Sequence, residues 1–161
     1  MNGDINKGIE LIEKGQTEEA LNLFFKLLDR EQNNAEILYQ IAWCLDILER
    51  GKDAIPYYEK AIEIGMDDEK LKGALLGLGS TYRTIGEYQS SLKIFNQAVL
   101  QYPTNNEFKV FRTMTNYNLG NHEDAMRELL EVIADTSSDE NVKAYKKAIL
   151  FYSDKLNQVW D

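Results

Sequence analysis

The chain carries one cysteine, Cys44, and one histidine, His122, the side chains best suited to nucleophilic or acid–base chemistry. An adjacent imidazole could activate a thiol by taking its proton. We expect no such pair, because the two residues belong to helical segments far apart in the chain and packed helix axes are already about 8–10 Å apart. Cys44 is interpreted as a small buried hydrophobe beside Trp43, and His122 as an exposed or packing residue.

Metal and phosphate sites have no better support in the sequence. There is no Cys/His cluster, and MDDEK at residues 66–70 lacks the ligand spacing of a calcium loop. GLGSTY at residues 77–82 has two glycines but no Gly-Lys-Ser/Thr after them, so it is not a phosphate-binding loop. We therefore expect no metal and no cofactor, and we predict that the chain is not an enzyme.

Charge and hydropathy exclude two partner classes. The 161 residues have a formal net charge of −9, which repels nucleic-acid phosphates. The nearest basic cluster, Lys143, Lys146 and Lys147, is interpreted as a solvated helix face. No apolar run approaches the roughly 20 residues of a membrane span, and the N-terminus does not resemble a signal peptide. We expect no nucleic-acid or membrane partner and a cytoplasmic location.

What remains is the arrangement of helices that would present a surface. One motif occurs four times: a glycine, a polar stretch, a small residue, then apolar residues at positions i+4 and i+7 that share one helix face. The small residues are Ala20, Ala54, Ser91 and Ala125, at intervals of 34, 37 and 34 residues. The copies read GQTEEALNLFFKLL, GKDAIPYYEKAI, GEYQSSLKIFNQAV and GNHEDAMRELLEVI, beginning at Gly15, Gly51, Gly86 and Gly120.

A second helical segment precedes these motifs, most clearly AEILYQIAWCLDIL at residues 35–48. Each repeat is therefore predicted to be a pair of antiparallel helices, A and B, with Asn33 or Asn34 and Asp67 or Asp68 as N-caps of the second and third A helices. We predict one domain, 1–161, with a C-terminal capping helix at about 138–157 that begins with a Ser137–Glu140 capping box. The repeats cover about 1–34, 35–68, 69–105 and 106–136.

The third copy resembles the tetratricopeptide repeat (TPR) family. AIPYYEKAIEIG, LKGALLGLGSTYRTIGEY and YNLGNHEDAM are further similar to a small bacterial branch, TPR group 5. The resemblance implies an all-α protein, a right-handed α-α superhelix (α-solenoid) of four TPR helix-turn-helix repeats plus the capping helix. It also implies that Gly8, Ala42 and Gly79 are the small residues where helix B crosses helix A. The residues at the family's signature spacing are Leu75, Leu78, Gly79, Tyr82, Gly86, Tyr88, Phe95, Ala98 and Pro103.

Two departures from the family pattern are visible. Gly51 stands two residues later than the family's turn glycine, so the second turn is expected to differ from the others. In the fourth A helix, polar residues such as Arg112 and Thr113 replace apolar or small ones, which is compatible with a helix rotated or shifted by a residue.

The resemblance implies a non-enzymatic protein–protein interaction module in which A helices line a concave groove that binds a peptide or helix of a partner. Some members of the family hold a C-terminal carboxylate with lysine, asparagine and arginine side chains. Those positions are occupied here by Ile5, Ile9, Gln40, Gly73 and Gly77, so the resemblance implies no such carboxylate clamp. The alternative is a scaffold that acts through homo-oligomerisation, such as a homodimer, and any groove residue could instead belong to the core. The predicted partner-binding groove contains Ile5, Ile9, Tyr39, Gln40, Trp43, Leu76, Ser80, Arg83, Met114 and Tyr117.

Overall fold

The computed structural model describes residues 2–160, and over that range it contains ten α-helices and no β-strand. The all-helical prediction is confirmed. The helices are α1 (Asn2–Glu13), α2 (Thr17–Leu28), α3 (Ala35–Ile47), α4 (Gly51–Ile64), α5 (Asp68–Thr84), α6 (Tyr88–Gln101), α7 (Asn106–Asn118), α8 (His122–Thr136), α9 (Glu140–Ala144) and α10 (Lys146–Tyr152).

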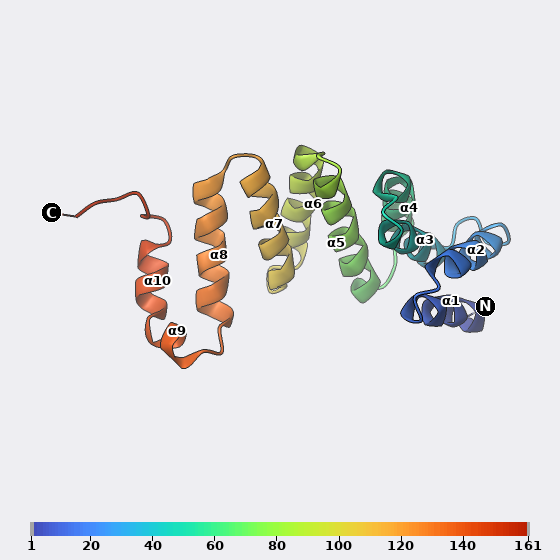
Figure 1. The fold of residues 1–161 in the computed structure, drawn as a ribbon, viewed down its shortest axis with the longest axis horizontal. Helices are drawn as coiled ribbons and strands as arrows, with labels where there is room; N and C mark the ends of the chain where they lie inside the picture. Colours follow the sequence, from blue (N-terminus) through green and yellow to red (C-terminus); the bar gives the residue numbers. More distant parts are fainter. Residues whose placement is uncertain (1, 161) are drawn as a thin grey trace. The chain divides into compact units, whose positions relative to one another are not determined.

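The chain forms two compact units, the first ending at Ser90 and the second beginning at Ser91 within α6. In the first unit α1 packs on α2, α3 on α4, and both α2 and α4 also contact the helix that follows them (Figure 1). In the second unit α7 packs on α8, and α8 on α10. Successive helices thus form hairpins that share their apolar sides, as the repeat pattern predicts.

The repeated apolar spacing marks the buried stripes of the B helices. Ala20 and Phe24 of α2 and Ala54 of α4 are fully enclosed, and Tyr58 is 1% exposed. Ser91, Phe95 and Ala98 of α6 are equally enclosed. Small residues alternate with large ones in each stripe, so neighbouring helices approach closely without leaving cavities.

The turns between A and B helices share one hydrogen-bonding pattern. After α5, Gly86 N–H donates to the Arg83 carbonyl (3.1 Å) and Glu87 N–H to the Tyr82 carbonyl (2.8 Å), while Gly86 has φ of 87°. This is the Schellman arrangement, in which a left-handed residue lets the chain satisfy the last helical carbonyls.

The second turn adopts the same arrangement without its glycine. Glu49, with φ of 58°, donates to the Asp46 carbonyl (3.0 Å), and Arg50 N–H donates to the Leu45 carbonyl (2.8 Å). The expectation of a different loop was wrong. Gly51 is instead the first residue of α4, where a Cβ would lie 3.0 Å from the Thr81 methyl group. A side chain at residue 51 would therefore be in tight contact with Thr81, while the left-handed turn position is occupied by Glu49.

We predict that Glu49→Gly raises the free energy of unfolding by about 0.5–1 kcal/mol, because glycine adopts positive φ without the clash between Cβ and carbonyl. The matched control is Gly86→Ala at the equivalent position, which has open space around its Cβ. It should lower the free energy of unfolding by about 1 kcal/mol, because alanine is strained at the positive φ of this position and has no other close contact. Urea unfolding measures both, and a stability loss in Glu49→Gly would contradict the assignment of strain.

The predicted close crossing is confirmed in the first hairpin, where a Cβ on Gly8 would lie 2.3 Å from Phe24 Cζ. Ala42 is fully buried in α3, and its crossing with helix B stays a prediction. Gly79 is buried in α5, and its crossing with the following helix stays a prediction. The close approach recovers dispersion contacts that offset the poor helix propensity of glycine.

The polar residues of α7 leave its register unchanged. Phe108, Thr113 and Thr115 are buried, and they stand 34 residues after Ala74, Gly79 and Thr81, which are the equivalent buried positions of α5. The suggested rotation or shift of the helix is therefore not needed. Hydrogen bonds compensate the polarity, since the fully buried Thr115 hydroxyl lies 3.0 Å from that of Ser91.

A buried polar network joins three helices of the first unit. Asp46 of α3 accepts hydrogen bonds from the Tyr58 hydroxyl of α4 (2.8 Å), and its carboxylate oxygens lie 2.8 Å from the Thr81 hydroxyl of α5. Burial raises the pKa of the Asp46 carboxyl, and the two hydrogen bonds partly oppose that rise. The network fixes the positions of α4 and α5 on α3.

Helix caps agree with the sequence in two cases and differ in a third. Asn34 accepts from the Glu36 and Ile37 N–H groups, and Asp67 from Lys70 N–H, as predicted. At α9 the N-cap is Asp139, which accepts from Asn141 and Val142 N–H. The predicted Ser137–Glu140 capping box is wrong, because Asp139 lies nearer the first turn.

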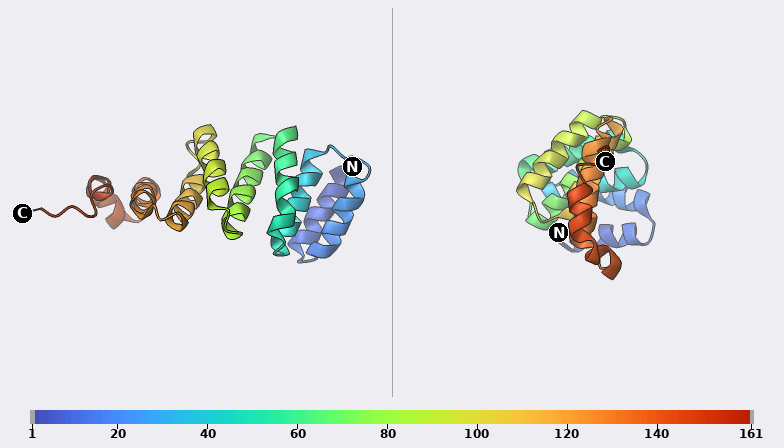
Figure 2. Two further views of the ribbon diagram at one scale, coloured as in Figure 1. Left: turned by 90° about the horizontal axis from the view of Figure 1, so that it is seen from above. Right: turned by 90° about the vertical axis from the view of Figure 1, so that its left-hand side faces the viewer.

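The predicted capping helix at 138–157 is shorter and divided. α9 ends at Ala144, Tyr145 has φ of −98° and ψ of 7°, and α10 runs only from Lys146 to Tyr152 (Figure 2). Side chains compete with the helix at its end: Ser153 donates to the Leu150 carbonyl (2.9 Å) and Lys155 to the Phe151 carbonyl (3.0 Å). α10 still packs on α8 and so covers the last hairpin.

Candidate functional site

Cys44 offers no accessible nucleophile. Its side chain is fully buried in α3, and burial raises the pKa of the thiol to about 12. His122, at the start of α8, lies against the Tyr117 ring, with ring centroids 4.7 Å apart. Among residues 2–160, no hydrogen bond or ion pair joins Cys44 to His122 or gives either residue an acid–base partner.

We predict that Cys44 reacts with an aromatic disulfide reagent near pH 8 about a thousandfold more slowly in the folded chain than in denaturant. The reason is that the reactive thiolate is suppressed by the raised pKa and shielded by packing. Cys44→Ala supplies the background, because the chain has one cysteine. Equal rates in the two states would contradict the burial.

The exposed face of α3 carries aromatic and aliphatic side chains at intervals of four residues. Trp43 is 39% and Ile47 44% exposed, and Tyr39 is partly buried. The Tyr39 and Trp43 rings are stacked, with centroids 6.4 Å apart and planes 16° apart. Trp43 is therefore held against a neighbour rather than free in solvent.

The Tyr39 ring packs in turn against Gly73 and Tyr58. A Cβ on Gly73 of α5 would lie 2.5 Å from the Tyr39 hydroxyl oxygen and 3.2 Å from its Cζ, so the end of the ring packs directly against the Gly73 backbone. The Tyr58 ring lies 6.2 Å away, centroid to centroid. Burial raises the pKa of the Tyr39 hydroxyl. The hydroxyl end is thus enclosed, and the stack on Trp43 has a rigid base.

α1 and α5 contact α3, and both helices carry further residues of the predicted groove. Ile9 of α1 and Leu76, Ser80 and Arg83 of α5 are partly buried. That they share a surface with Trp43 stays a prediction. We use the name Trp43 surface for this predicted set: Ile9, Tyr39, Trp43, Ile47, Leu76, Ser80 and Arg83.

Two predicted groove residues belong to the core instead. Ile5 is 3% exposed and Gln40 is 4% exposed. On α1, Ile5 lies three residues before Gly8, the close contact with α2, and on α3 Gln40 is followed by buried Ile41 and Ala42. Gln40 Oε1 has no hydrogen-bond donor among the described residues. Neither side chain offers a partner appreciable area.

The remaining predicted residues lie in the second unit. Met114 is 39% and Tyr117 64% exposed on α7. Both side chains are exposed, and their membership of a partner-binding groove stays a prediction.

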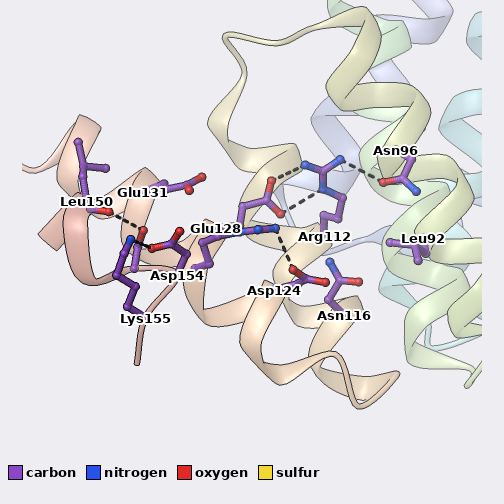
Figure 3. A pocket seen from close by; sticks show the side chains of 12 residues that line it. Leu92, Asn96, Arg112, Asn116, Asp124, Glu128, Glu131, Leu150, Asp154 and Lys155 are labelled. Carbon is purple, nitrogen blue, oxygen red and sulfur yellow. Dashed lines mark hydrogen bonds and ion pairs between the residues drawn. The ribbon is translucent and has the colours of Figure 1, made fainter. Parts of the chain in front are cut away.

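The second unit also contains a charged cleft of about 570 Å³ between α6, α7, α8 and α10. Figure 3 shows Arg112 between Glu128 and Asn96, with Nε donating to Glu128 Oε2 (3.1 Å) and Nη1 to Asn96 Oδ1 (3.0 Å). Arg112 Nη2 also pairs with Glu128 Oε1. The only signal in the sequence was the unusual arginine in α7, since Glu128 is indistinguishable from any exposed helical glutamate.

Each cation that lines the cleft has a carboxylate beside it. Arg127 pairs with Asp124 (2.8 Å), and Lys155 with Asp154. An incoming anion would have to compete with these pairs, so the cleft is poorly suited to phosphate. We treat it as a structural ion-pair cluster.

Within residues 2–160, no group of three or more His, Cys, Asp or Glu side chains is arranged to hold a metal ion. None of the helices described is both long and apolar enough to cross a membrane.

Comparison with known proteins identifies the repeat. A family model described as Tetratrico peptide repeat (TPR_5) matches residues 35–156. A search of curated proteins found no match.

Solved structures show the same fold at low identity. The crystal structure of YrrB, a TPR protein with an unusual peptide-binding site, is 24% identical, with a TM-score of 0.71 over 88% of this chain and 71% of YrrB. MamA 41-end from Desulfovibrio magneticus RS-1 is 16% identical, with a TM-score of 0.76 over 97% of this chain and 87% of that one. A tetratricopeptide repeat protein from Parabacteroides merdae ATCC 43184 is 22% identical, with a TM-score of 0.68 over 93% and 61%. At these identities the likeness concerns the fold alone.

Proposed function

Because the chain belongs to the tetratricopeptide repeat family, a generally non-catalytic protein-interaction fold, we propose that its Trp43 surface binds a peptide or helical segment of a partner protein. The partner would present apolar side chains to Trp43, Ile47 and Leu76. Arg83, at the edge of the same surface, would contact an acidic or carbonyl group of the partner.

The observation that carries this proposal is that the Trp43 side chain is exposed while its ring stacks on Tyr39. A tryptophan that keeps 39% of its surface in solvent while stacked on Tyr39 offers a large contact area. Because the stack is fixed by Gly73 and Tyr58, little side-chain entropy remains to be lost on binding. Tryptophan, tyrosine and arginine are also the residues most enriched at energetic centres of interfaces.

The relative YrrB makes a peptide the first class of partner to test, since it is a TPR protein with a peptide-binding site. TPR proteins bind protein partners, and recognition by a helical surface commonly uses an amphipathic helix or an extended chain. Both place apolar side chains at regular intervals, which matches the four-residue interval of Tyr39, Trp43 and Ile47.

We predict that peptides selected from a displayed library against the full chain carrying Trp160→Ala, which removes the exposed C-terminal tryptophan as a competing anchor, lose affinity by about tenfold or more on Trp43→Ala, because an aromatic anchor is removed. Isothermal titration measures the affinity. The matched control is Ile64→Ala on α4, because Ile64 is exposed to the same extent, 39%. That variant should bind as the wild type does.

Circular dichroism should be unchanged in both variants, because neither side chain is in the core. If the selected peptides bind Trp43→Ala with wild-type affinity, or lose affinity on Ile64→Ala instead, the Trp43 surface is not the binding site.

The alternative, a scaffold that acts by homo-oligomerisation, stays a prediction. Light scattering over a concentration series distinguishes it, because self-association raises the mean mass with concentration and peptide binding does not. A dimer that dissociates into monomers on Trp43→Ala would favour the alternative.

A further inference from the structure

The C-terminal segment exposes a second aromatic surface. Phe151 and Tyr152 of α10 are 52% and 48% exposed, and Trp160 of the following tail is 50% exposed. The Trp160 ring lies 5.4 Å from Tyr152 and 6.3 Å from Phe151, centroid to centroid. We call these three residues the aromatic patch. Within the second unit α10 packs on α8 and α9 (Figure 1), and the three patch side chains stay about half exposed.

Three large aromatic side chains gathered together, each about half exposed, are unusual on a protein surface. Single exposed apolar residues are ordinary, but apolar side chains that lie next to one another commonly mark an interaction site.

The patch is ordered before any partner arrives. The Phe151 and Tyr152 rings meet edge to face with centroids 5.0 Å apart. Lys155 Nζ lies 4.8 Å from the Phe151 ring centroid and donates to the Phe151 carbonyl (3.0 Å). Both contacts hold the tail over the end of α10, so that binding orders few additional side chains.

The charges beside the patch define the partner. Lys147 precedes Phe151 by four residues on α10, which places it on the same helix face. Among the described residues it has no hydrogen-bond or ion-pair partner. Lys155 adds a second ammonium group at the Phe151 ring, although Asp154 pairs with it. A partner with carboxylates beside its apolar side chains would complement both.

We propose that the aromatic patch docks an acidic amphipathic helix of a partner protein, at a site separate from the Trp43 surface. Aliphatic side chains of that helix contact Phe151, Tyr152 and Trp160, and flanking glutamates or aspartates pair with Lys147. A symmetric second copy fits less well, because a two-fold contact would bring equivalent lysines towards each other.

The test uses the full chain and two synthetic helices of roughly 18 residues with leucines three and four positions apart. One has glutamate on its polar face and the other lysine. Affinities are measured at about 0.15 M salt, where long-range repulsion from the acidic chain is screened. The glutamate peptide should bind. Trp160→Ala should weaken it by about tenfold, and Lys147→Glu by about fivefold. Lys147→Arg and Trp43→Ala should change little.

Trp160 lies in the tail outside the helices, so Trp160→Ala should leave the circular dichroism unchanged and remains informative. The lysine peptide should show no binding that depends on Trp160. The proposal would be overturned if the glutamate peptide did not bind, or if both peptides bound with equal affinity that depends on Trp160. Loss of binding on Trp43→Ala instead of Trp160→Ala would also overturn it. So would a dimer seen in sedimentation that dissociates on Trp160→Ala, because the patch would then bind a second copy of the chain.

Discussion

Gly77→Ala is expected to lower the free energy of unfolding by about 2–3 kcal/mol, although alanine is the better helix former. A Cβ at this position of α5 would lie 2.5 Å from the Tyr58 hydroxyl oxygen and 2.6 Å from its Cζ. Tyr58 is 1% exposed and donates to Asp46, so its ring cannot move aside without breaking that hydrogen bond. Urea unfolding followed by circular dichroism measures the change.

Two further variants isolate the cause. Gly3→Ala in α1 has nothing within 4 Å of the new Cβ, and it should leave stability unchanged or slightly raised. In a Tyr58→Leu background the cost of Gly77→Ala should largely disappear, which gives a coupling energy of about 1 kcal/mol or more. A cost that persists in that background would show that the close contact is not its source.

The second large effect concerns Arg112 in the other unit. Arg112→Met is expected to cost about 2–3 kcal/mol, because Glu128 keeps only 13% of its side-chain surface exposed and would lose its cation. Chemical denaturation at neutral pH measures this loss. Arg127→Met is the matched control, because its pair with Asp124 is about half exposed on both sides (46% and 62%). That change should cost less than about 1 kcal/mol.

The double variant Arg112→Met/Glu128→Met should recover most of the loss, since it leaves no uncompensated charge in the cleft. A double variant as unstable as Arg112→Met alone would mean that the helix needs arginine for packing rather than for charge.

The hairpins were predictable because they depend on local, repeated signals. The apolar intervals that begin at Ala20, Ala54 and Ser91 reappear as buried stripes, and Asn34 and Asp67 cap the helices that follow them. Such signals act within one or two turns of helix. The family model, which covers residues 35–156, agrees with this prediction.

What the sequence missed depends on contacts between segments distant in the chain. The second turn appeared irregular because Gly51 is displaced, but Glu49 takes the left-handed conformation and Gly51 avoids Thr81, 30 residues later in the chain. Arg112 appeared to disturb α7 because its partner Glu128 lies 16 residues away on another helix. Helical spacing alone cannot identify either partner.

The candidate site was also predictable only in part. Trp43 and Tyr39 were chosen by their position in the second A helix, because the family resemblance implies that A helices line the groove, and the structure places their rings in a stack. Ile5 and Gln40 share the expected spacing but are buried, since the width of an exposed stripe depends on how closely neighbouring helices approach. The exposure of Phe151 and Tyr152 was not predicted, because the single helix expected at about 138–157 is divided into α9 and the short α10.

The central claim, that partners bind at the Trp43 surface, is tested most directly by the two tryptophan indole N–H resonances of the chain. The protein contains only Trp43 and Trp160, so one nuclear magnetic resonance spectrum reports on both surfaces. The peptide is selected against the full chain carrying Trp160→Ala, so that the aromatic patch does not select it. On titration of the unmodified chain with that peptide, the account predicts that the Trp43 resonance shifts in proportion to occupancy while that of Trp160 stays in place. A saturating peptide that leaves the Trp43 resonance unmoved would contradict it.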